Sequence, residues 1–77
     1  MIAKRGMIME MDNQQRFLVD DVKNINGVDY VVFYSLENKG FYIATEVVEN
    51  KKPKYKFLED AESIKIAEAI DKIDHNN

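Results

Sequence analysis

The chain has 77 residues, of which 45% are apolar and 32% charged, and it contains no cysteine. A chain this short closes one core, so we expect a single domain over residues 1–77, with residues 1–6 and 75–77 flexible, and neither disulfide bonds nor thiolate metal clusters. Eleven basic and fourteen acidic side chains give a net charge of −3, which disfavours general affinity for nucleic acids.

The first predicted elements are a short strand at residues 7–11, a turn through "DNQQ" and a longer strand that ends at Ile25. Asn26-Gly27 follows, and this pair is typical of a type I′ turn because both of its central residues need positive φ. The turn predicts an antiparallel hairpin in which paired residues share a face. Its register places Ile25 opposite Val28, Asp21 opposite Val32, Val19 opposite Tyr34 and Phe17 opposite Leu36.

A second hairpin is predicted at "ENKG", residues 37–40, because Asn and Gly favour turns. It places Leu36 opposite Phe41, Tyr34 opposite Ile43 and Tyr30 opposite Val47. One face of the sheet then carries most of the large apolar residues, and we expect it to be the core. That face consists of Phe17, Val19, Ile25, Val28, Tyr30, Val32, Tyr34, Leu36, Phe41, Ile43 and Val47.

A last strand at residues 55–58 is expected after the turn-forming "ENKKPK". Beyond it Ile66, Ile70 and Ile73 recur at helical spacing, and Asp60 is a suitable N-cap. The expected fold is α+β: an antiparallel meander of four to five strands with one C-terminal helix packed on one face.

The order of these features resembles a family of small bacterial proteins known as domain of unknown function 1292 (DUF1292). The resemblance lies in Ile8 with Asp12, in the "YVVFY" strand at residues 30–34 and in the acidic helix entry at residues 59–64. The basic "KKPKYK" stands here in place of an acidic insert that many members carry, and Ile64 in place of a tryptophan. The resemblance implies a fold and a bacterial origin, and it implies no activity.

Residues suited to catalysis or metal binding are few. His75 is the only histidine and lies in a polar tail, so no base is positioned beside Ser35 or Ser63. Asp20 and Asp21 are adjacent in a strand, where alternation directs their carboxylates to opposite faces and so prevents joint chelation. We therefore expect no catalytic residues, no metal site and no cofactor, and we expect that the protein is not an enzyme.

The face of the sheet opposite the helix is the first binding candidate. Strand alternation gives it apolar residues, and one helix cannot cover both faces. Because monomers rarely expose large contiguous apolar patches, we expect a homodimer or a protein partner there, unless the N-terminal "MIMEM" or the tail covers it. The candidate partner-binding residues are Leu18, Val31, Phe33, Tyr42 and Ala44.

The basic segment at residues 51–56 is the alternative candidate. Its lysines could contact phosphates while Tyr55 stacks on a base, or they could only keep a sheet edge from pairing with other chains. The nucleic-acid candidates are Lys51, Lys52, Lys54, Tyr55 and Lys56. The longest apolar run, "YVVFY", is too short to span a bilayer and the start lacks a signal-peptide pattern, so we expect a cytoplasmic protein.

Overall fold

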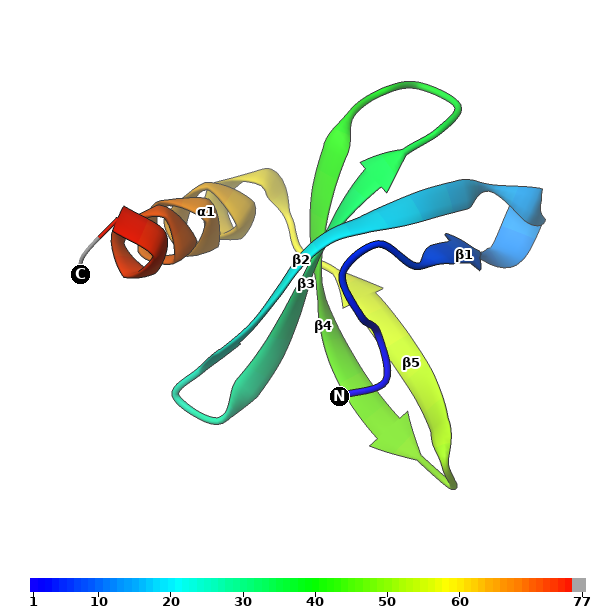
Figure 1. Ribbon diagram of the computed structural model, residues 1–77, viewed down its shortest axis with the longest axis horizontal. Helices are drawn as coiled ribbons and strands as arrows, with labels where there is room; N and C mark the ends of the chain where they lie inside the picture. The colour runs from blue at the N-terminus through cyan, green and yellow to red at the C-terminus, as the bar shows by residue number, and fades with distance from the viewer. Residues whose placement is uncertain (76–77) are drawn as a thin grey trace.

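The computed structural model describes residues 1–75, which form one antiparallel sheet and one C-terminal helix (Figure 1). The sheet has five strands in the order β1-β2-β3-β4-β5, so it is a meander, and the predicted α+β fold is confirmed. Of the tail that we expected to be flexible, residues 76–77 lie outside the described part. The strands are β1 (Ile8–Glu10), β2 (Arg16–Ile25), β3 (Val28–Ser35), β4 (Phe41–Glu49) and β5 (Lys52–Phe57), a 3-10 turn spans Asp12–Gln14, and the helix α1 spans Asp60–His75.

The turn between β2 and β3 is the one that Asn26-Gly27 predicts. Asn26 has φ of 51° and Gly27 φ of 84°, and Ile25 pairs with Val28. Asn24 supports the turn: its side-chain oxygen accepts from the Gly27 N–H at 3.2 Å, and its amide donates to Asp29 at 2.7 Å. The hairpin is therefore fixed by local chemistry.

Gly27→Val is expected to destabilise the domain by about 1 kcal/mol or more, because a β-branched residue resists positive φ. No other atom lies within 4 Å of a Cβ built at Gly27, so the cost comes from the backbone alone. Urea unfolding measures the effect, and Gly27→Asn, which tolerates the left-handed region, serves as the control. Equal stability of the two variants would contradict the assignment of strain to this turn.

A β-bulge at Asp20 changes the register of the first half of β2. Val19 pairs with Phe33 and Asp21 with Val32, so Asp20 is an extra residue in β2. The predicted pairs of Val19 with Tyr34 and Phe17 with Leu36 are wrong, because one inserted residue exchanges the faces of everything before it. Phe17 therefore pairs with Ser35, and Phe17 and Val19 lie on the face that carries Phe33.

The hairpin at "ENKG" differs from the predicted register, and the last strand differs from its predicted bounds. Tyr34 pairs with Phe41, not with Ile43, but a shift of two residues leaves each side chain on its face. Strand β5 begins at Lys52, earlier than expected, because Asn50 and Lys51 take φ of 51° and 64° and close a two-residue turn.

The sheet curls around the face that carries Phe33, which we call the concave face. The ring centroids of Phe17 on β2 and Phe57 on β5 lie 5.7 Å apart. In a flat sheet, three strand spacings of about 4.8 Å would separate these strands by about 14 Å. The curl thus makes a core from the face that we expected to be free, with Phe33 fully buried at 0% exposure. The buried cluster contains Ala3, Phe17, Val19, Val31, Phe33 and Ala44.

The N-terminal residues 1–7, which we call the strap, cross part of the concave face (Figure 1). Ala3 is 2% exposed, and the N–H groups of Ile2 and Ala3 donate to the carboxylate of Glu46 at 2.7 and 2.8 Å. The Tyr55 hydroxyl donates to the same carboxylate at 2.7 Å, and burial together with this bond raises the Tyr55 pKa well above its usual value. The cover thus comes from residues that we expected to be flexible, with Ala3 at its centre, whereas the "MIMEM" at residues 7–11 contains β1 and adds only Met9 and Met11 to the edge of the same core.

Helix α1 lies on the opposite, convex face and packs mainly against β4. It begins at Asp60, the residue predicted as its N-cap, so it starts one residue earlier than expected, and the Glu59 carbonyl accepts the Ser63 N–H at 2.8 Å. The helix buries Ile70. Lys23 on β2 donates to Asp74 at 2.7 Å, a hydrogen bond that raises the pKa of Lys23 and lowers that of Asp74. In residues 1–75 no helix is long and apolar enough to cross a membrane.

Candidate interaction surface

Four apolar side chains form a row across the convex face, one from each of four adjacent strands. The pairs Ile8–Leu18, Leu18–Tyr34 and Tyr34–Phe41 are directly opposite each other in the sheet. Opposite residues share a face with Cβ atoms about 5 Å apart, so the four form one continuous strip, which we call the convex row. Its ends, Ile8 and Phe41, are each 63% exposed, and Leu18 and Tyr34 are half-buried.

A groove between α1 and the sheet continues the convex row. It has a volume of about 440 Å³, and both Phe41 and Ile64 line it. Ile64 is 60% exposed although it lies in the helix that covers this face. The floor of the groove comes from Val32 and Ile43 on the sheet, with Ala67 and Ile70 of the helix beside them.

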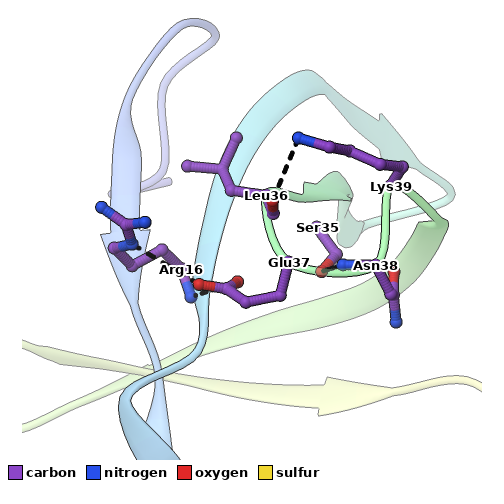
Figure 2. A network of polar contacts seen from close by, with 6 residues as sticks. All are labelled: Arg16, Ser35, Leu36, Glu37, Asn38 and Lys39. Atoms are coloured by element: carbon purple, nitrogen blue, oxygen red, sulfur yellow. Dashed lines mark hydrogen bonds and ion pairs between the residues drawn. The ribbon is translucent and has the colours of Figure 1, made fainter.

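The loop between β3 and β4 is held in place beside the row by the polar contacts in Figure 2. The Arg16 N–H donates to Glu37 at 3.1 Å, and the Arg16 side chain contacts the same carboxylate at 3.5 Å. Lys39 donates to the Leu36 carbonyl at 3.1 Å, while the Leu36 N–H donates to the Arg16 carbonyl. The bonds between Arg16 and residues 36 and 37 join the loop to β2. They hold the loop in one position next to Tyr34 and Phe41.

The far end of the groove is acidic. Asp20 and Asp21 both line it, together with Asp71 and Asp74 of the helix. The expectation that Asp20 and Asp21 point to opposite faces is wrong, because alternation fails at the bulge. Among residues 1–75, no group of three acidic, histidine or cysteine side chains is arranged to hold a metal ion. Lys23, 2.7 Å from Asp74 and 3.9 Å from Asp21, balances part of this charge.

The predicted partner-binding residues divide between core and surface. Val31, Phe33 and Ala44 are fully buried, so they do not form a surface; the curl of the sheet turned their face into the core. Tyr42 is exposed at the rim of the concave face, where Asn38 donates to its hydroxyl at 2.7 Å. Leu18 lies on the convex face and belongs to the convex row.

Sequence reasoning assigned Tyr34, Phe41 and Val47 to a core beneath the helix, but Phe41 and Val47 are exposed. Geometry explains the error. A five-stranded sheet is about 20 Å across, whereas a helix about 10 Å wide covers roughly two strands. The groove beside the helix is lined by Val32 and Ile43, whereas Phe41 and Val47 stay more than half exposed. A comparison of these two widths would have indicated, from the sequence alone, that part of the helix-bearing face stays uncovered.

The basic segment is strand β5 and not a loop, apart from Lys51 in its turn. Tyr55 is not free to stack on a base: its hydroxyl is bonded to Glu46, and its ring meets that of Phe33 at 5.3 Å. The side chains of Lys51, Lys52, Lys54 and Lys56 are exposed, and Lys54 pairs with Glu49 at 3.1 Å. These contacts do not favour stacking of Tyr55 on a base, and nucleic-acid binding by this segment stays a prediction.

The hydroxyl and imidazole groups are engaged locally. Ser35 Oγ accepts from the Asn38 N–H, and Ser63 Oγ donates to the Leu58 carbonyl at 3.4 Å. His75 contacts the carbonyl and the carboxylate of Asp71, one helical turn earlier, and these contacts raise its pKa. Within residues 1–75 neither serine is hydrogen-bonded to His75.

Comparison of the chain with protein-family models, curated proteins and solved structures found no match. The resemblance to domain of unknown function 1292 therefore stays a prediction.

Proposed function

We propose that this is a small non-catalytic interaction protein that self-associates through the convex row. The observation that supports the proposal is the unbroken strip of Ile8, Leu18, Tyr34 and Phe41, whose two ends are more than half exposed. A contiguous apolar strip on a small domain is typical of an interaction site.

A second copy of the chain suits this strip for two reasons. The row contains no charged side chain, so two copies can meet without placing like charges in contact. It also has an aromatic end, where the rings of Tyr34 and Phe41 lie 5.0 Å apart, and an aliphatic end formed by Ile8 and Leu18. A twofold axis would place the aromatic end of one copy on the aliphatic end of the other, which is the self-complementarity that such dimers need.

The area required is modest. A specific interface buries at least about 500 Å² per partner, which is about one tenth of the 5766 Å² surface of the chain. The row together with the mouth of the groove beside Ile64 would supply the apolar centre of such a contact.

Ile8→Lys and Phe41→Lys are each expected to weaken the dimer by about 30-fold or more, because a lysine in a desolvated contact removes a central apolar anchor. Sedimentation velocity over a wide range of concentrations measures the monomer–dimer equilibrium. The free energy of unfolding of each monomer should change by less than about 0.5 kcal/mol, since both positions are exposed.

Ile73→Lys is the matched control, because Ile73 is also an exposed isoleucine, at 47%, but lies in the last turns of α1 outside the convex row. It should leave the dimer unchanged. A wild-type protein that stays monomeric at the highest concentration would reject self-association. Equal weakening by all three substitutions would show that the row is not the contact.

A further inference from the structure

The concave side of the sheet opens into a groove between its two edge strands. In residues 1–75, β1 pairs only with β2, and β5 only with β4, so the curled sheet does not close. The groove has a volume of about 670 Å³ and is lined from both edges. Its apolar wall consists of Met9, Met11, Phe17, Pro53, Tyr55 and Phe57. The polar residues Glu10, Asp12, Asn13 and Gln15 line the side of β1 and its turn, and Lys54 lines the side of β5.

The turn at Asn50-Lys51 determines which backbone groups of β5 face this opening. In a two-residue hairpin the closing pair, Glu49 with Lys52, is hydrogen-bonded, and bonded and non-bonded pairs then alternate. The bond from the Leu58 N–H to the Ile43 carbonyl, 2.9 Å long, fits this alternation. The backbone groups of Pro53, Tyr55 and Phe57 therefore point away from β4, and Pro53 stands where the missing N–H breaks no bond of the sheet.

The side chains of β5 divide into two chemical classes. Tyr55 and Phe57 contribute to the aromatic cluster of the concave face, at 5.3 and 5.8 Å from Phe33. Alternation places Lys52, Lys54 and Lys56 on the other side of the strand, and all three are exposed. A strand laid along β5 would thus have an apolar groove on one side and a row of lysines on the other.

We propose that the free edge of β5 accepts an extended peptide in which apolar and acidic residues alternate. The peptide backbone would bond to the outward groups of Tyr55 and Phe57, its apolar side chains would enter the groove, and its carboxylates would lie beside Lys54 and Lys56. The lysines disfavour pairing of this edge with the β5 edge of a second copy, because two such edges side by side would bring like charges together. This site is independent of the convex row.

The test uses the full chain and a fluorescein-labelled octapeptide in which valine or phenylalanine alternates with glutamate. Anisotropy titration measures its affinity, with a second peptide that carries lysine in place of glutamate as the charge control. Amide shifts from NMR locate the site, and they should be largest at Tyr55 and Phe57. The double variant Lys54→Glu, Lys56→Glu is expected to lose about tenfold or more in affinity for the acidic peptide. The double variant Lys65→Glu, Lys72→Glu, a matched change of two exposed helix residues, should have little effect.

Three results would support the proposal. The glutamate peptide should bind more tightly than the lysine peptide, and methylation of its alternate backbone nitrogens should abolish binding. The amide shifts should be confined to the β5 edge. Equal affinity for the two peptides would overturn it, as would shifts on the convex row or no binding at all. The two peptides are compared on the wild-type protein, so the result does not depend on whether the double variant folds.

Discussion

Phe33→Lys is expected to unfold the domain. Phe33 is fully buried, and its ring meets those of Phe17, Tyr55 and Phe57 at 5.6, 5.3 and 5.8 Å. Loss of a buried phenylalanine costs about 3–5 kcal/mol, and burying an amine without a partner adds several more. A domain of this size has a total stability of only about 5 kcal/mol or slightly more, so the folded state should not survive.

Tyr34→Lys is the matched control, because it makes the same change at the next residue of the same strand, on the convex face. Circular dichroism with thermal unfolding should show a folded protein for Tyr34→Lys and none for Phe33→Lys. If both variants melted cooperatively at similar temperatures, the concave face would not be the core. The conclusion that the sheet curls around Phe33 would then be wrong.

The sequence predicts well the features that short-range chemistry determines. The Asn26-Gly27 turn needs only two residues that accept positive φ, and the start of α1 follows to within one residue from a change of hydrophobic period. These elements gave the correct strand order and fold class, because a meander follows once each turn is tight.

The division into core and surface could not be predicted in the same way. It depends on one inserted residue, Asp20, which exchanges the faces of Phe17 and Val19. Asp21 gave no signal for the bulge, because it pairs with Val32 with or without the inserted residue, and only the residues before Asp20 change partners. The curl depends on aromatic contacts such as that of Phe17 with Phe57, forty residues apart by the numbering, and no local pattern encodes them.

The same long-range packing explains why the candidate interaction surface lies on the other face of the sheet from the predicted one. We expected Phe33 and its neighbours to be exposed because a single helix cannot cover both faces of a sheet. The premise is correct, since the helix covers only one face, but the conclusion is wrong. It omitted the possibility that a curled sheet and the strap cover the second face without a helix. The uncovered apolar surface is therefore on the helix side, where Leu18 alone of the predicted partner-binding residues remains.

Glu46→Ala is expected to release the strap and to destabilise the domain by about 2–4 kcal/mol, because each buried donor left without an acceptor costs about 1–3 kcal/mol. Glu46 is only 5% exposed, and it accepts hydrogen bonds from the Ile2 and Ala3 N–H groups and from the Tyr55 hydroxyl. The loss stays below the sum of three such penalties, since a released strap regains hydrogen bonds to water.

Trypsin provides a direct readout of the strap, because Lys4 and Arg5 lie within it. Cleavage at these two residues should be much faster in Glu46→Ala than in the wild type, and the amide protons of Ile2 and Ala3 should lose their protection from exchange. Glu49→Ala is the control: it removes an exposed carboxylate of the same strand that pairs with Lys54, a contact worth less than about 1 kcal/mol. Equal stability and equal cleavage of the two variants would show that Glu46 does not hold the strap, and that the concave core is closed by apolar contacts such as that of Ala3 alone.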